Sequence, residues 1–293
     1  RQQMILLMEG REHLPPWLAT CRTALIPKNR DTHLANNYRP IACQNSMYKL
    51  YTGILNVFLE EHCTSNGVIY DEQAGGRKGT WGCSDQLLIN KMVLDEVRLH
   101  QRSLFMMWFD YKKAFDSVPH QWIIESLKLA KVPQTLLQPI INLMGSWSTK
   151  INLQFKDASI TTDQISFKTG ILQGDCLAML LFVLSMNPLS CLLNQCSGYK
   201  IGRPESRNAV LTHLLFVDDL KTFDMNRKDA ELKLDVVTQF TRDVGMQLGS
   251  DKCAYLSIER GKIKITGEHL NVNGFALKEL GVDEPDKYLR IDE

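Results

Sequence analysis

Three aspartates follow two strongly apolar segments of the chain. Asp110 ends the apolar run 104–109 (LFMMWF), and Asp218 and Asp219 end the run 211–217. Each aspartate alone is explained equally well by a turn, because Asp favours turns. If the two runs pair as strands, however, the three carboxylates meet at one edge of a sheet, where their mutual repulsion requires a cation.

Carboxylate oxygens are the ligands that Mg²⁺ prefers, at about 2.0–2.1 Å, and Mg²⁺ usually shares its coordination with phosphates. Two such ions about 3.5–4 Å apart can activate a hydroxyl and stabilise the leaving oxygen of an in-line displacement. The three aspartates therefore indicate nucleotide polymerisation, with two Mg²⁺ ions, or Mn²⁺ in their place, as cofactors.

The segments that must position these residues predict an α+β fold. The continuous apolar run 104–109 predicts a strand that is buried on both faces. The run 211–217 predicts a second strand, with a tight turn at 218–219 and a returning strand over 220–223. The segments 147–155 and 160–167 predict a hairpin, and short strands are expected within 245–258 and 262–266.

Helices are expected over 120–131, over 230–244, and from Ser84, as the N-cap, to about residue 100. In the helix that begins at Ser84, one face should be buried, and it carries Ile89, Met92, Val93 and Val97. A further, strongly apolar helix should follow Gly174 and end at about residues 187–188, an Asn-Pro pair.

The composition is that of an ordinary globular protein. The 293 residues are 44% hydrophobic and 23% charged, which excludes disordered and collagen-like classes. The net charge of +1 neither requires nor excludes a nucleic-acid partner. The absence of a glycine-rich GKS or GKT loop excludes a P-loop NTPase.

The eight cysteines form no CxxC pair, so we expect reduced thiols inside the cell. We also expect no membrane partner, because no apolar run has the length of a membrane span and no secretory leader opens the chain. The first residue is Arg1, which suggests a piece of a longer protein.

Seven segments together resemble the reverse transcriptases of non-LTR retrotransposons, in the order of that family's motifs, over nearly the whole chain. The wording of NYRPI and DYKKAFDSVPH is most similar to site-specific elements that use a restriction-like endonuclease. The seven segments are ALIPKN…NYRPI (24–41), DEQAGGRKG (71–79), FDYKKAFDSV (109–118), GILQGD (170–175), LLFVDDL (214–220), GMQLGSDKC (245–253) and KYLRI (287–291).

The resemblance implies roles at the metal site. Asp110 and Asp218 would bind both metal ions, Asp219 would complete the acidic cluster, and the carbonyl of Tyr111 would add an oxygen ligand. Lys252 matches a lysine that approaches the pyrophosphate leaving group, where an ammonium can donate a proton.

The resemblance also implies nucleotide-binding residues. Phe115 matches the sugar gate, whose ring would clash with a 2′-OH and admit deoxyribose. Gln173 and Gly174 would lie beside the nascent base pair, where glycine permits close approach of the backbone. Lys28 and Arg39 would grip the incoming triphosphate.

Four further residues would contact nucleic acid. Arg77 and Lys78 match a loop that would touch template phosphates, and Tyr288 and Leu289 match the segment that would hold the primer end. The implied partners are thus an RNA template, a DNA primer and a dNTP, and a nuclear location is expected. The oligomeric state is left open.

The fold implied is a right-hand polymerase whose palm is a small antiparallel sheet backed by helices. Residues 1–102 would form the fingers and residues 103–293 the palm, with part of 120–170 open to assignment to the fingers. The thumb would lie beyond residue 293.

Some positions depart from the family pattern. Cys176 and the residues after it, through Met179, replace the usual Pro-Leu-Ser-Pro, and Arg290 stands where glycine is usual. These departures leave open a nucleic-acid-binding remnant without catalysis. An RNA-directed RNA polymerase is disfavoured, because Phe115 and Val217 stand where that class is expected to carry Asp and Gly.

Overall fold

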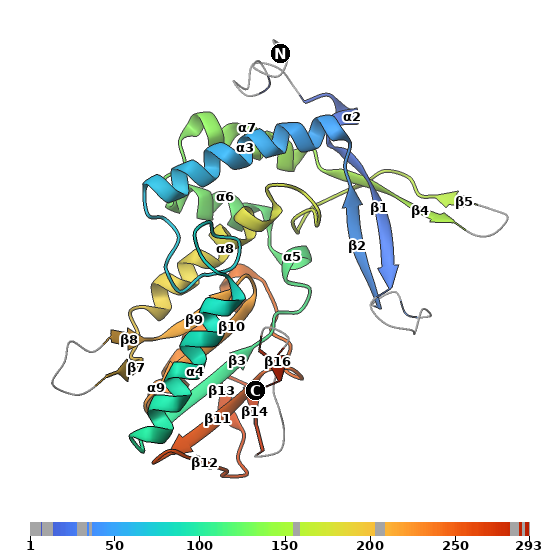
Figure 1. Ribbon diagram of the computed structural model, residues 1–293. Coiled ribbons are helices and arrows are strands. Elements are labelled where there is room, and N and C mark those ends of the chain that lie inside the picture. Colours follow the sequence, from blue (N-terminus) through green and yellow to red (C-terminus); the bar gives the residue numbers. More distant parts are fainter. Residues whose placement is uncertain are drawn as a thin grey trace. The chain divides into compact units, whose positions relative to one another are not determined.

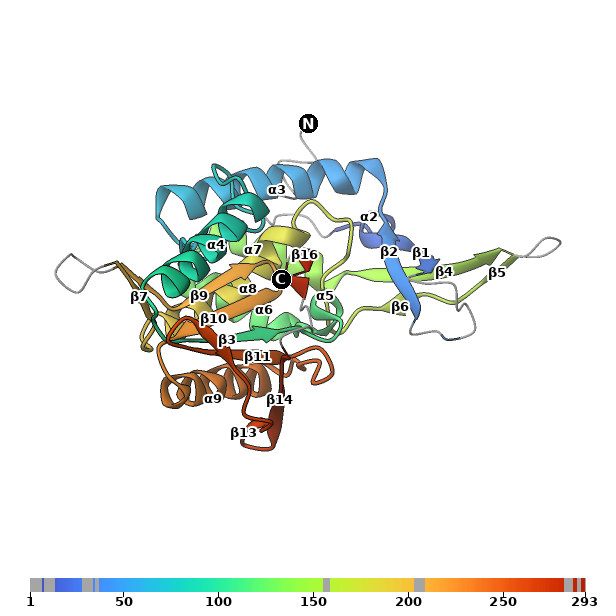
Figure 2. The same ribbon diagram turned by 60° about the horizontal axis from the view of Figure 1, so that its bottom comes forward.

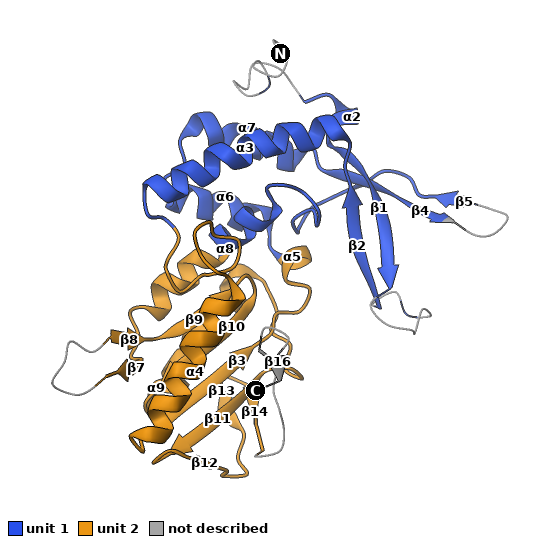
Figure 3. Cartoon of the chain, in the orientation of Figure 1, with its two compact units in different colours: residues 1–68, 118–185 blue, residues 69–117, 186–293 orange. Residues whose placement is uncertain are grey.

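The computed structural model describes residues 7, 14–27, 34, 37–154, 159–202, 209–281, 287–288 and 291–292 (Figure 1). The chain forms two compact units, residues 1–68 with 118–185 and residues 69–117 with 186–293 (Figure 3). Each unit is assembled from two separate stretches of sequence. The assignment of residues 1–102 to fingers and 103–293 to palm stays a prediction.

The second unit is built on a sheet with the strand order β13-β14-β11-β3-β10-β9, in which β12 also pairs with β11. All pairings are antiparallel except that of β11 with β14. Every residue of the central strand β3 is buried, as its continuous apolar sequence predicts. The strands are β3 (Leu104–Phe109), β9 (His213–Phe216), β10 (Asp219–Asp224), β11 (Ala254–Glu259), β12 (Lys262–Lys264), β13 (Leu270–Val272) and β14 (Phe275–Glu279).

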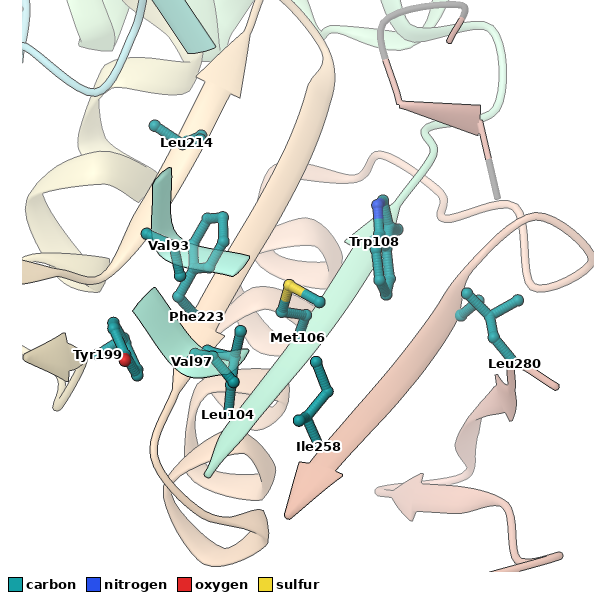
Figure 4. Packing of buried hydrophobic residues seen from close by; sticks show 11 residues of the cluster. Val93, Val97, Leu104, Met106, Trp108, Tyr199, Leu214, Phe223, Ile258 and Leu280 are labelled. Carbon is teal, nitrogen blue, oxygen red and sulfur yellow. The ribbon is translucent and has the colours of Figure 1, made fainter. Parts of the chain in front are cut away.

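Two helices lie on opposite faces of strands β3 and β10, α4 (Cys83–Leu99) on one and α9 (Arg227–Val244) on the other (Figure 2). Val93 and Val97 of α4 join a core cluster with Leu104 and Met106 of β3 and with Phe223 of β10 (Figure 4). The expected α+β architecture, a mainly antiparallel sheet backed by helices, is confirmed.

The first unit holds a sheet with the order β2-β1-β4-β5, in which β6 also pairs with β4. Strand β4 is antiparallel to both β5 and β6, so the hairpin expected over residues 147–167 is confirmed. The elements are α2 (Pro16–Ala19), β1 (Thr20–Pro27), β2 (Tyr38–Cys43), α3 (Ser46–Ser65), α6 (His120–Leu129), α7 (Gln134–Gly145), β4 (Ser148–Gln154), β5 (Ser159–Thr161) and β6 (Ile165–Ser166).

The shorter elements and α8 complete the described structure. They are α5 (Ala114–Ser117), α8 (Ala178–Leu193), β7 (Tyr199–Ile201), β8 (Ala209–Leu211), β15 (Lys287–Tyr288) and β16 (Ile291–Asp292). Within the described residues, no helix combines the length and the apolar character that crossing a membrane requires.

The start of α4 differs from the expectation. The helix begins at Cys83, and its N-cap is Gly82, whose φ of 65° lies in the left-handed region. Ser84 therefore lies inside the first turn and is not the cap. Met92 is also wrong as a core residue, because it is 60% exposed while Val93, the next residue, is buried.

Two other boundaries were wrong. Helix α8 continues through Pro188 to Leu193. Its residues from Leu180 to Met186 are all buried. The free energy gained by burying these side chains exceeds the cost of the one backbone hydrogen bond that Pro188 removes. The strand expected within 245–258 begins only at Ala254, because residues 247–249 bond to the chain just after β3 instead.

Candidate active site

Asp110 and Asp218 are brought together by the pairing of β3 with β10. Leu220, the second residue of β10, lies opposite Phe109, the last residue of β3. Asp110, the next residue along the chain, therefore lies beside the first residue of β10. Asp218 lies in the turn that joins β9 to β10. Burial, followed by the nearby charge of Asp110, raises the pKa of Asp218 above its usual value. The two carboxylates therefore converge as predicted, but the predicted pairing is wrong: β3 pairs with the returning strand β10, whereas the run 211–217 contributes β9, which pairs with β10.

The turn itself lies one residue earlier than expected. Val217 and Asp218 form it, and Asp219 is already the first residue of β10, opposite Phe216. In the part of the chain that the structure describes, no three His, Cys, Asp or Glu side chains gather as a metal site. The metal-binding roles of Asp219 and of the Tyr111 carbonyl stay predictions.

Lys252 lies beside the aspartates. Its Nζ is 3.2 Å from Oδ2 of Asp110, and its side chain is 64% exposed. The segment that carries it is bound to the residues after β3: Gly249 N donates to the carbonyl of Asp110 at 2.7 Å, and Lys112 N donates to that of Gln247 at 2.8 Å. Lys252 lies in a turn and not after a strand as expected, and its role as a proton donor stays a prediction.

The donor set suits a divalent cation. Asp110 and Asp218 offer carboxylate oxygens, and burial raises the pKa of Asp218, a cost to its charged form that a bound cation would offset. The ammonium of Lys252 at 3.2 Å already places one positive charge against Asp110. A side chain at position 249 would crowd the site, because a Cβ built on Gly249 lies 3.1 Å from Oδ2 of Asp110.

Sequence reasoning missed one residue that contacts this turn. Gln73 is 1% exposed, and its Oε1 accepts a hydrogen bond from Val217 N at 2.9 Å. Its Nε2 donates to the carbonyl of Val217 at 3.4 Å. The signal in the sequence was its place in the segment DEQAGGRKG, for which the resemblance implied roles only for Arg77 and Lys78.

In the first unit, the loop 173–175 is fixed from two sides. Gln173 accepts a hydrogen bond through its carbonyl from Ala42 N of β2 at 3.0 Å. Gly174 has a φ of 102°, and a Cβ there would lie 3.2 Å from the carbonyl of Ala42. Asp175 is buried and accepts a hydrogen bond from the hydroxyl of Tyr48 at 2.9 Å.

Comparison with known proteins gives the family. Residues 26–280 match the family described as "Reverse transcriptase (RNA-dependent DNA polymerase)". The chain belongs to the reverse transcriptase family. Members of this family use divalent metal ions, in agreement with the two aspartates and with the fit described above.

Two curated relatives of this reverse transcriptase chain come from R2 elements. It is 28% identical over 247 residues to the Pol polyprotein of the type-2 retrotransposable element R2DM of Drosophila melanogaster, covering 84% of the chain and 22% of the relative. It is 30% identical over 253 residues to that of a type-1 element R2 of Popillia japonica, covering 85% and 33%. The chain thus spans a third or less of the length of these relatives. The similarity to R2 elements supports the expected non-LTR type of reverse transcriptase.

Solved structures support the expected right-hand polymerase fold. The structure of telomerase from Candida albicans in complex with an RNA fragment superposes with a TM-score of 0.60 at 11% identity, covering 89% of the chain and 46% of that structure. Apo telomerase from Candida tropicalis, truncated from its C-terminal domain, gives 0.59 at 12% identity, covering 90% and 54%.

The remaining predicted residues of this reverse transcriptase chain lie in several places. Phe115 lies in α5 and is half-buried, Arg39 is exposed on β2, and Lys78 is exposed. Arg77 forms an ion pair with Asp71 of its own loop at 2.7 Å. Roles for these residues stay predictions.

Four of the positions discussed above lie at the margin of the described structure. Lys28 and Leu289 fall outside the described residues, as does the departure at Arg290. Only the backbone of Tyr288 is described, in β15 opposite Ile291.

The anchor of the loop 173–175 yields a prediction. Tyr48→Phe is expected to lower the free energy of unfolding by about 2 kcal/mol, because it removes the acceptor of the buried Trp147 Nε1 and one donor to the buried Asp175 carboxylate. The hydroxyl accepts from Trp147 Nε1 at 2.8 Å and donates to Asp175, whose pKa is raised by burial. The loss should be larger at about pH 7 than at about pH 4, where the Asp175 carboxyl gains its own proton.

Urea unfolding at both pH values measures this effect. Tyr51→Phe is the matched control, because Tyr51 is equally buried on α3 and its hydroxyl makes a long hydrogen bond, donating to the carbonyl of Leu7 at 3.4 Å. Equal losses for the two variants, or no dependence on pH, would contradict the prediction.

Proposed function

We propose that this chain catalyses RNA-directed DNA synthesis for a non-LTR retroelement, adding dNTPs to the 3′-OH of a DNA primer on an RNA template. The observation that carries the proposal is the pairing of β3 with β10, which sets Asp110 beside Asp218 with Lys252 at 3.2 Å. Membership of the reverse transcriptase family supports it.

Each of these residues has a specific task. Asp110 and Asp218 would hold two Mg²⁺ ions, which when bound favour deprotonation of the primer hydroxyl and stabilise charge on the leaving oxygen. Lys252, whose Nζ lies 3.2 Å from Oδ2 of Asp110, would donate a proton to the departing pyrophosphate. The chain otherwise contributes the positioning of the reacting groups.

Primer extension tests the proposal. The 293-residue chain is expected to extend oligo(dT) on poly(rA) with dTTP and Mg²⁺, while Asp218→Ala gives no product. Equal background from both proteins would support a non-catalytic remnant. Preference for ribonucleotides over deoxyribonucleotides would support an RNA polymerase instead.

Phe115 is proposed to select the sugar. Phe115→Val is expected to reduce the preference for dNTP over rNTP by about 10²-fold, since a smaller side chain removes the clash with the 2′-OH. Single-nucleotide incorporation kinetics measure the two values of kcat/KM. Phe115→Tyr keeps the ring and should keep the preference, and a wild-type preference in Phe115→Val would reject the gate.

Two further parts of the proposal concern the parent protein. We propose a site-specific element with a restriction-like endonuclease, and the similarity to R2 elements supports this. We also propose an intracellular, nuclear location, which the eight free thiols of the chain support.

A further inference from the structure

The backbone of the turn between β9 and β10 is strained at Val217. This residue has a φ of 60°, in the left-handed region that β-branched residues rarely adopt. Glycine occupies this region without penalty, but here the residue before Asp218 is a buried valine. Such a conformation persists only when neighbouring groups hold it in place.

The side-chain amide of Gln73 holds both polar groups of Val217. Its Oε1 accepts from Val217 N at 2.9 Å, and its Nε2 donates to Val217 O at 3.4 Å. The same Oε1 also accepts from Gly75 N at 2.9 Å, which fixes the amide itself. Because Gln73 is 1% exposed, water does not compete for these bonds.

The segment that carries Gln73 is anchored to strand β9. Ala74 N donates to the carbonyl of Leu215 at 3.0 Å, and Leu215 N donates to that of Glu72 at 2.9 Å. Gly75 packs so closely that a Cβ there would lie 2.6 Å from both Val217 N and its Cγ2. The segment that carries Gln73 is therefore held rigidly against β9, and only glycine fits at position 75.

We propose that Gln73 is a positioning residue for the metal-binding turn. Its amide holds Val217 in the left-handed conformation and so fixes the backbone that presents Asp218 beside Asp110. The consequence for catalysis rests on the proposed function, whereas the consequence for binding of a divalent ion does not.

Binding of Mn²⁺ alone, measured by calorimetry on the 293-residue chain, tests the proposal. Gln73→Met keeps the size of the side chain and removes all three hydrogen bonds. It should weaken Mn²⁺ binding about 10-fold or more, the usual effect of removing a residue that orients a metal ligand. In primer extension it should lower kcat more than it changes the KM for dTTP.

Gln86→Met is the matched control. Gln86 is also a 1% exposed glutamine, and its Nε2 donates to the carbonyls of Glu72 and Leu215, at 2.9 and 2.7 Å. These two bonds of Gln86 go to residues outside the turn 217–218. Its variant should therefore lose stability while keeping the wild-type affinity for Mn²⁺.

A rescue separates positioning from a general structural role. Adding Val217→Gly to Gln73→Met should restore much of the Mn²⁺ affinity, because glycine adopts a positive φ without the hydrogen bonds from the Gln73 amide. If Gln73→Met does not fold, Gln73→Glu replaces it, since it keeps both acceptor bonds and turns the donor bond to Val217 O into a repulsive contact between two oxygens.

The outcomes are distinct. Mn²⁺ affinity in the Gln73 variants equal to that of Gln86→Met, or no Mn²⁺ binding by the wild type, would overturn the inference. If the wild type binds Mn²⁺ but extends no primer, the proposed function is rejected. The Mn²⁺ affinities of the Gln73 and Gln86 variants would then still decide whether Gln73 positions the turn.

Discussion

Replacing Asp218 by asparagine is expected to lower kcat by about 10³-fold while making the protein more stable. The loss follows because bound metal ions contribute several kcal/mol of charge stabilisation, and each ~1.4 kcal/mol is tenfold in rate. The gain, of about 1 kcal/mol, follows because burial and Asp110 both disfavour the charged carboxylate.

The pH dependence has a defined sign. The pKa of Asp218 is raised above its usual 3.8, so the fold favours the protonated form. The stability that protonated Asp218 contributes is fully present below its pKa in the unfolded chain. It is lost as the pH rises through the pKa of Asp218 in the folded protein. The asparagine variant should therefore be more stable than the wild type at neutral pH and equal to it near pH 3.

Thermal unfolding at several pH values and primer extension measure the two effects. Asp243→Asn serves as the control, because Asp243 is exposed on α9 and lies outside the site. An Asp218→Asn variant with a kcat close to that of the wild type, or one that is less stable than the wild type at neutral pH, would refute this account.

Lys233→Met is expected to cost about 3–5 kcal/mol of stability, because it leaves a buried carboxylate without its cation. Lys233 and Asp224 have fully buried side chains, and their Nζ and Oδ1 lie 2.7 Å apart. The ammonium also donates to the carbonyls of Thr212 at 2.9 Å and Phe223 at 3.0 Å. Burial raises the pKa of Asp224, and Lys233 opposes that rise.

A double-mutant cycle in urea measures the coupling. Lys233→Met combined with Asp224→Leu should recover most of the loss, since an apolar pair of similar volume needs no desolvated charge. The exposed residue Lys228, on the same helix, provides the control Lys228→Met, which should be neutral. A loss in Lys233→Met no larger than in this control would contradict the prediction.

The sequence predicted those features that depend on local pattern. The run LFMMWF is a fully buried strand, since a continuous apolar segment has no face that could stay in water. The end of α8 was wrong because tertiary burial outweighed the local effect of Pro188. Met92 was wrong because helical periodicity defines a face but not how wide its buried part is.

The site shows the same limit. The approach of Asp110 to Asp218 was predicted, but the strand pairing behind it was not. Asp218 precedes β10, and the antiparallel pairing of β10 with β3 sets the start of β10 beside the end of β3. The role of Gln73 could not be predicted, since it depends on a side chain reaching the backbone of a residue 144 positions away. No residue pattern in either segment records such a contact.

The position of β3 in its sheet has a consequence for synthesis of the protein. Both of its partner strands, β10 and β11, follow it by about 110 residues or more. At about 5–20 residues per second, a ribosome needs on the order of 10 s to deliver them. During that interval the nascent chain carries an unpaired, aggregation-prone hexapeptide, and binding by a chaperone such as a holdase would raise the yield of soluble protein.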